Sequence, residues 1–158
     1  MASEEGQATL EAAMLLPTLM LMLAMLVQPA CILYTRCVML SAAAEGCRLM
    51  ATADPDAGQV GQSCLDYVRR RLGAVPDVPI FHVGGQDGWS IELGGGVSEH
   101  EASARIVGTV TPLPLLGVIP ALLGETDGEG NVVVDVRVTQ TTRPSWLDGG
   151  YDDWTADW

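Results

Sequence analysis

An uncharged run of 24 residues, Ala12–Thr35, constrains this chain more than any other feature. A helix rises about 1.5 Å per residue, so the run would cover roughly 36 Å, against a bilayer hydrocarbon core of about 30 Å. Pro17 and Pro29 lie inside it, and membrane helices tolerate prolines as kinks. A buried core helix is the alternative, but the other residues offer too little apolar surface to cover a helix that is apolar on all sides. The run therefore predicts a membrane-spanning helix.

The charges of the chain exclude one class of partner. Its 158 residues include eight Arg, no Lys and 20 Asp or Glu, which gives a formal net charge of −12. Such a chain repels phosphate backbones instead of releasing their counterions, so no nucleic acid partner is expected. The length leaves room for one modest domain beside the membrane segment.

The residues before the run do not resemble a secretory signal. Residues 1–7 read MASEEGQ, with two acids and no basic side chain, whereas a signal peptide begins with positive charge and has a shorter apolar run. The charges that flank the run bear on which side of the membrane the rest of the chain lies. Arg36 and Arg48 follow the run and no basic residue precedes it, so the positive-inside rule alone would leave the carboxyl-terminal part in the cytoplasm.

Residues 6–17 read GQATLEAAMLLP. They resemble the class III signal sequences of type IV pilin-like proteins, particularly the TadE-like family of tight-adherence pilus systems. In that family a short polar leader ends in Gly and is cut by prepilin peptidase on the cytoplasmic side. The resemblance implies a cut after Gly6, with Gln7 as the new amino terminus. The apolar run then stays attached as membrane anchor and assembly helix.

Glu11 lies at the edge of the apolar run. A carboxylate costs about a few kcal/mol at the centre of a membrane and less near the interface, so it needs a partner. The resemblance implies that Glu11 pairs with the amino terminus of a neighbouring subunit and sets the axial register of a filament. The alternative is an acid that begins a helix, is favoured by the helix dipole and faces the headgroups.

Three later segments add to the resemblance. Residues 41–49, SAAAEGCRL, are similar to the small-residue stretch that follows the span in TadE-like chains, and residues 110–117 and 132–140 are similar to their carboxyl-terminal pattern. The resemblance implies a minor pilin or pseudopilin, not an enzyme, with no cofactor. Its partners would be membrane lipid, other pilin or TadE- and TadF-like subunits, prepilin peptidase and the Tad secretion platform. An uncleaved, membrane-tethered binding module is the alternative.

The expected organisation is a single-pass membrane protein with a cytoplasmic amino terminus and an extracytoplasmic carboxyl-terminal domain, incorporated in a pilus. Residues 1–6 form the leader and residues 7–35 the transmembrane and assembly helix. Residues 36–145 form an extracytoplasmic α+β domain. Residues 146–158 form an acidic, aromatic and flexible tail.

The domain itself is predicted to be α+β. Small and apolar residues continue the first helix to about Ala53, and a second helix from about Gln59 to Leu72 completes a helical hairpin. Alternation of apolar and polar residues then predicts a small antiparallel sheet, whose buried face the helices cover. The candidate strands are residues 80–83, 89–93, 104–111 and 132–138.

The four cysteines lie in different surroundings. Cys31 is in the apolar run and Cys37 just beyond it, while Cys47 and Cys64 lie on either side of the turn between the two helices. An antiparallel hairpin would bring Cys47 and Cys64 together. In an oxidising exterior, a bridge closing a loop of about 18 residues would contribute roughly 3 kcal/mol. No metal site is expected, because the chain has no CxxC and its two histidines are remote in sequence.

No catalytic constellation is present in the sequence. There is no GxSxG, no phosphate-binding loop and no Lys. Glu99, His100 and Glu101 are neighbours whose side chains would point apart, so a solvated turn is expected there. Residues 127–131 lack the spacing of a calcium-binding loop and are expected to form a turn before the last strand. The apolar segment 112–124 is expected to be a surface loop or short helix that contacts neighbouring subunits or membrane, and it is the preferred candidate for subunit contact outside the anchor.

Overall fold

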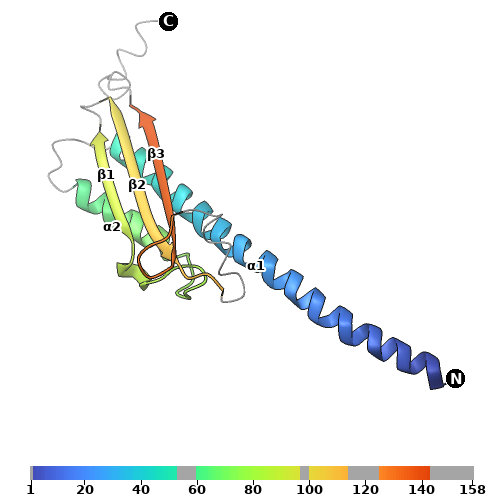
Figure 1. The fold of residues 1–158 in the computed structure, drawn as a ribbon. Helices are drawn as coiled ribbons and strands as arrows, with labels where there is room; N and C mark the ends of the chain where they lie inside the picture. Colours follow the sequence, from blue (N-terminus) through green and yellow to red (C-terminus); the bar gives the residue numbers. More distant parts are fainter. Residues whose placement is uncertain (1, 53–59, 97–99, 114–124, 143–158) are drawn as a thin grey trace, which may run out of the picture.

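The computed structural model describes residues 2–52, 60–96, 100–113 and 125–142. These residues form two α-helices, one short 3-10 helix and three strands. Figure 1 shows a long helix that carries a small domain at one end. The predicted fold class is confirmed: a long apolar amino-terminal helix continues into a helical hairpin, and a small antiparallel sheet follows.

Helix α1, Ala2–Thr52, is the longest element, with 51 residues. At about 1.5 Å per residue it extends over roughly 76 Å. Its amino-terminal half projects away from the domain, and its carboxyl-terminal half lies along the sheet (Figure 1). Pro17 and Pro29 both lie inside it, and each lacks the N–H that would bond four residues earlier.

Helix α2, Val60–Leu72, packs antiparallel to the carboxyl-terminal half of α1. Cys64 and Val68, four residues apart on one face, are both buried. Just beyond the end of α2, the Ala74 carbonyl accepts a hydrogen bond of 3.0 Å from the Tyr34 hydroxyl of α1. The predicted second helix and the hairpin are therefore confirmed.

Three arginines, Arg69, Arg70 and Arg71, lie in the last turn of α2. Positive charge is favourable there because the carbonyl end of a helix carries partial negative charge. Arg71 Nη2 also lies 3.6 Å from Glu45 Oε1 of α1. Exposed pairs of this kind contribute little to stability, so the cluster is explained mainly by the helix end.

Three strands form one antiparallel sheet in sequence order: β1 (Ser90–Gly96), β2 (Glu101–Val110) and β3 (Val132–Thr141). The 3-10 helix η1, Gly85–Asp87, precedes β1. The register places Ile91 opposite Ile106, and Ile106 opposite Val136. Apolar side chains of all three strands therefore share one face, and the predicted small antiparallel sheet is confirmed.

The core lies between that face of the sheet and the two helices. Alternate residues of β2, including Ala104 and Ile106, are fully buried, and α1 contacts both β2 and β3. Gly46 of α1 allows a close approach of α2, because a Cβ at that position would lie 2.9 Å from Val68 Cγ2. Small residues in α1 thus let helix and sheet pack closely.

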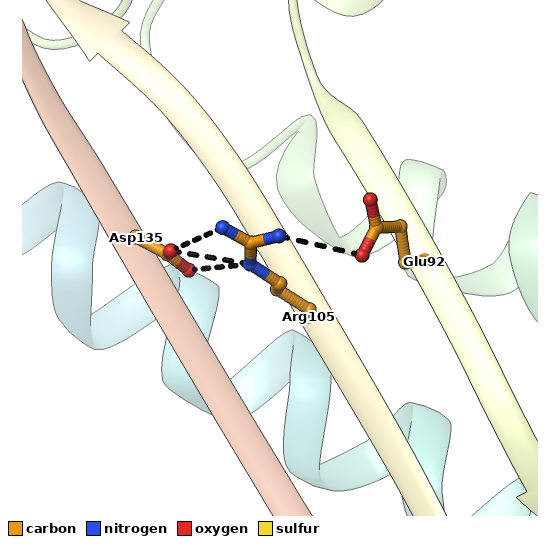
Figure 2. A network of polar contacts seen from close by, with 3 residues as sticks. All are labelled: Glu92, Arg105 and Asp135. Atoms are coloured by element: carbon orange, nitrogen blue, oxygen red, sulfur yellow. Dashed lines mark hydrogen bonds and ion pairs between the residues drawn. The ribbon is translucent and has the colours of Figure 1, made fainter.

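The opposite face of the sheet carries charged side chains. Figure 2 shows Arg105 of β2 between Glu92 of β1 and Asp135 of β3, with the helices behind the strands. Arg105 Nη2 donates to Asp135 Oδ2 at 2.7 Å, and Arg105 Nη1 lies 3.6 Å from Glu92 Oε2. The hydrogen bond from Arg105 lowers the pKa of Asp135. This ion network links all three strands across a solvated surface.

The strand predicted over residues 80–83 does not form, and that prediction is wrong. The N–H groups of Phe81 and His82 both donate to the Val78 carbonyl, at 2.8 and 3.0 Å, which closes a turn. Pro79 lies inside this turn and has no N–H for a sheet ladder. The apolar residues of this segment therefore cover the end of the sheet without extending it.

The turn predicted before the last strand is present. Asp127 Oδ1 accepts the N–H groups of Glu129 and Asn131, at 2.9 and 2.8 Å, and Gly130 has a φ of 83°. His100 is exposed. Glu99, most of the segment 112–124 and the tail 146–158 lie outside the described residues.

Candidate functional site

The amino-terminal half of α1 is not covered by any other described part of the chain. Every described side chain from Gln7 to Val27 is exposed, except the half-buried Ala24. α1 is long and apolar enough to cross a membrane, and none of its most apolar stretch is buried. Its large apolar side chains are 45 to 68 % exposed: Leu10, Met14, Leu15, Leu16, Leu19, Met20, Leu21, Met22, Leu23, Met25, Leu26 and Val27. A continuous apolar surface of this size marks an interaction site for lipid or protein.

Glu11 is the one charged side chain among those described from Gln7 to Val27. Gln7 Nε2 donates to Glu11 Oε1 at 3.3 Å, and both side chains are exposed. Residues four apart in a helix lie on the same face, so the structure brings these two predicted site residues together. An ionised carboxylate has several acceptor positions, so Glu11 can still bind a cation while it accepts this hydrogen bond.

The predicted cut between Gly6 and Gln7 falls inside α1, which begins at Ala2. The first N–H groups of a helix have no partner within it, and helix ends fray. Cleavage at this bond would require the first turns of α1 to unwind.

Two polar side chains of the uncharged run bind the domain. Gln28 Oε1 accepts the N–H of Leu113 at 2.8 Å, and Thr35 Oγ1 donates to the Phe81 carbonyl at 2.8 Å. Gln28 and Thr35 are each 1 % exposed. Contact between α1 and the domain therefore begins at Gln28, well before the end of the uncharged run.

Sequence reasoning missed these two residues because it treated Ala12–Thr35 as one uniform apolar run. The available signal was their spacing. Gln28, Cys31, Thr35 and Met39 follow one another at intervals of three or four residues, and all four are buried. Polar side chains that recur on one helical stripe indicate a face that packs on protein.

A comparison with protein families bears on the same helix. The model of the family described as TadE-like protein matches residues 6–48. This segment of α1 is therefore similar to TadE-like proteins. No curated protein and no solved structure matches the chain. The match covers well under half of the chain and lies entirely within α1.

The TadE-like match covers the bare half of α1, residues 7–27, whose side chains are exposed apart from Ala24. It also covers most of the stripe of buried residues that begins at Gln28. It begins at Gly6, the residue of the predicted cut, and ends at Arg48, shortly before the helix ends at Thr52. The small residues in 41–49 have a structural role, since several of them are buried against α2 and the sheet. The segments 110–117 and 132–140 lie outside the match, so their likeness to TadE-like chains stays a prediction.

All four cysteines are free thiols in the structure, and the predicted bridge between Cys47 and Cys64 is not confirmed. Cys47 Sγ instead donates to the Val138 carbonyl at 3.3 Å, so it faces the sheet. Cys64 is buried on α2. Burial raises the pKa of both thiols, which keeps them neutral and poorly nucleophilic.

A buried histidine follows α2. His82 is 3 % exposed, and its ring stacks on Trp89 with the centroids 3.5 Å apart and the planes 10° apart. His82 Nε2 lies 3.0 Å from the Gly85 carbonyl oxygen, and burial lowers the pKa of the ring. Gly108 makes room for the pair, because a Cβ there would lie 2.5 Å from Trp89 Cζ3. No group of three metal-ligating side chains occurs among the described residues, so His82 is assigned to packing.

Proposed function

We propose that this chain is a minor pilin or pseudopilin-like structural component of Tad-type pilus assembly. Its α1 helix would anchor it in the membrane, with the amino terminus in the cytoplasm and the domain outside. The observation that carries the proposal is the bare apolar half of α1, with Glu11 at its beginning, inside the TadE-like segment. Apolar surface costs about 25 cal/mol per Å² when water covers it. Before assembly, lipid would cover this apolar surface. Within a pilus, neighbouring subunits would cover it, and either would remove the cost of its exposure to water.

Prepilin peptidase would process the chain after Gly6 and leave Gln7 as the amino terminus. The new ammonium group would lie one helical turn from Glu11, at the end of the apolar stem. A carboxylate at this depth is stabilised by pairing with a cation, and the amino terminus of a neighbouring subunit supplies one. The proposed partners are therefore membrane lipid, pilin or TadE- and TadF-like subunits, the peptidase and the Tad secretion platform.

Mass spectrometry of the mature protein tests the processing step. In cells with active prepilin peptidase, the protein should lack residues 1–6 and begin at Gln7. Cells without the peptidase should keep the full-length chain. A mature chain that begins at Met1 or Ala2 despite an active peptidase would contradict the proposed cleavage.

The variant Glu11→Gln tests the assembly step, because it removes the charge and keeps the size of the side chain. Membrane insertion should be unchanged, while the number of pili per cell should fall clearly. Glu129→Gln is the matched control, since Glu129 is exposed in the turn before β3. Normal piliation with Glu11→Gln would remove the proposed role of Glu11.

An impermeant maleimide tests the topology, because Cys37 is the exposed thiol among the four. Intact cells should be labelled at Cys37 if the domain is outside. Labelling only after the cells are lysed would place the domain in the cytoplasm, as the arginines that follow the run would suggest.

An uncleaved, membrane-tethered binding module is the second candidate. The acidic leader residues Glu4 and Glu5, together with a helix that runs through the predicted cut, favour it. It predicts a full-length protein and no effect of Glu11→Gln on assembly. Mass spectrometry of the mature protein and the Glu11→Gln variant therefore separate the two functions.

A further inference from the structure

We infer that the domain sits on the bilayer through an apolar rim, formed by residues 78–81 and 112–113, at the point where α1 leaves the domain. This inference rests on the membrane-spanning role proposed for α1, and it names a second lipid contact of the same protein. The partner is the outer surface of the bilayer that α1 crosses.

Hydrogen bonds fix the apolar rim against α1. The Leu113 N–H donates to Gln28 Oε1 at 2.8 Å, and the Phe81 carbonyl accepts the Thr35 hydroxyl at 2.8 Å. The two parts of the rim are also tied together, because the Thr111 N–H donates to the Pro79 carbonyl at 2.8 Å. In Figure 1 the loop that follows α2 lies at the end of the sheet nearer the bare half of α1.

The apolar rim consists of uncharged, apolar residues: Val78, Pro79, Ile80, Phe81, Pro112 and Leu113. Val78 is 46 % exposed, Pro79 is exposed and the others are half-buried. The opposite end of the sheet is polar, since Glu101 and Thr141 pair there and both are exposed. The rim is therefore the apolar part of the end next to the membrane helix, where the turn of residues 125–131 also places the exposed Glu125 and Glu129.

The length of the bare helix places the rim at the edge of the lipid. If the hydrocarbon core begins beside Glu11, its thickness of about 30 Å takes about 20 residues and ends near Cys31. The bare residues 12–27 cover only about 24 Å of this. Gln28 then lies about 4.5 Å inside the hydrocarbon edge, and Thr35 lies about 6 Å outside it. Because the rim is bonded to α1 at both levels, it straddles that edge.

The rim also meets part of the cost of placing an amide at the depth of Gln28. Unpaired polar groups are costly in hydrocarbon. The Gln28 oxygen is bonded to Leu113, while its Nε2 is buried with no hydrogen-bond partner among the described residues. The rim shields this side chain from lipid. Apolar loop residues next to it would in turn gain by leaving water for the boundary between headgroups and acyl chains.

Spin-label accessibility in vesicles tests the inference on the full-length chain. Three single labels are compared in a Cys37→Ser background, which removes the exposed native thiol: Val78→Cys in the rim, Leu21→Cys in the bare helix and Thr141→Cys at the polar end. The protein is reconstituted into vesicles of phosphatidylcholine and phosphatidylglycerol. Collision with oxygen, which partitions into lipid, is measured against collision with a water-soluble nickel chelate.

Labels at Val78 and Leu21 should collide several-fold more with oxygen than the label at Thr141 does, and less with nickel. A Val78 label with the nickel accessibility of Thr141, beside a lipid-exposed Leu21, would overturn the rim and leave the span intact. A water-exposed Leu21 would overturn the proposed membrane span itself. Low accessibility of Val78 to both reagents would mean that protein covers it, such as a second copy, and would also overturn the rim.

Discussion

His82 makes the stability of the domain depend on pH through one buried ring. Burial lowers its pKa below the ordinary 6.5, so the ring is neutral in the folded chain. The unfolded chain binds the proton more readily than the folded chain does. The free energy of unfolding therefore decreases as the pH is lowered through the range in which the unfolded chain holds more protons. That loss begins as the pH drops below about 6.5 and amounts to about 1.4 kcal/mol for each unit of pKa shift.

We therefore expect the melting temperature of the detergent-solubilised protein to fall between pH 7.5 and pH 5.5. His82→Phe should remove most of this fall while keeping a ring against Trp89. His100→Gln is the matched control, because His100 is exposed, and it should behave like the wild type. Asp127 and Asp135 have lowered pKa values and titrate below this window. An unchanged pH dependence in His82→Phe would show that another group is responsible.

The cysteines make a second prediction at the scale of residues. In the native protein, iodoacetamide should modify Cys37 first, while Cys47 and Cys64 stay protected because they are buried and have raised pKa values. After denaturation without reductant, all four thiols should react. If mass spectrometry then finds only two alkylated cysteines, the chain contains the disulfide that the sequence suggested and the structure lacks.

At the scale of elements, the hydrogen bond between Thr35 and Phe81 fastens α1 to the turn after α2. Thr35→Val keeps the shape of the side chain and leaves the part-buried Phe81 carbonyl without its donor, a loss of about 1 to 3 kcal/mol. The melting temperature in detergent should fall accordingly. Thr52→Val is the matched control, since the exposed Thr52 hydroxyl donates within the last turn of α1, to the Arg48 and Leu49 carbonyls. Equal effects of the two variants would contradict the importance of this junction.

Most elements could be predicted because their side-chain spacing matches their surroundings. The second helix repeats buried residues every four positions, and β2 and β3 alternate buried and exposed ones. Residues 80–83 failed because a short apolar segment has the same composition in a strand and in a packed turn. What distinguishes the turn is that the N–H groups of Phe81 and His82 both donate to the Val78 carbonyl. These hydrogen bonds cannot be read from the composition of the segment.

The candidate site was predictable only in part. Gln7 and Glu11 are four residues apart, so the sequence alone places them on one helical face. Gln28 and Thr35 could not be separated from lipid-facing residues by hydropathy, because their neighbours are as apolar as the rest of the run. Their partners, the backbones of Leu113 and Phe81, are distant in sequence, and only the folded chain brings them together.

At the scale of the whole molecule, one helix serves two environments. The described side chains from Gln7 to Val27 are exposed, apart from the half-buried Ala24, while the stripe that begins at Gln28 is buried. Substitutions in the two halves should therefore have separable effects. Changes in the bare half should affect membrane integration, and changes in the stripe should affect the stability of the domain.

A matched pair of arginine substitutions along α1 tests this separation. Leu21 and Leu40 are similarly exposed, at 48 and 41 %, but Leu21 lies in the middle of the proposed span and Leu40 about 13 Å beyond the hydrocarbon edge. Arginine at the centre of a membrane helix costs about 2.5 to 3.5 kcal/mol. Leu21→Arg should therefore increase the fraction of protein that alkaline carbonate extracts from membranes, while Leu40→Arg should not. Both variants should keep the melting temperature of the wild type in detergent, because both side chains are exposed. Equal extraction of the two variants would mean that lipid does not surround residue 21.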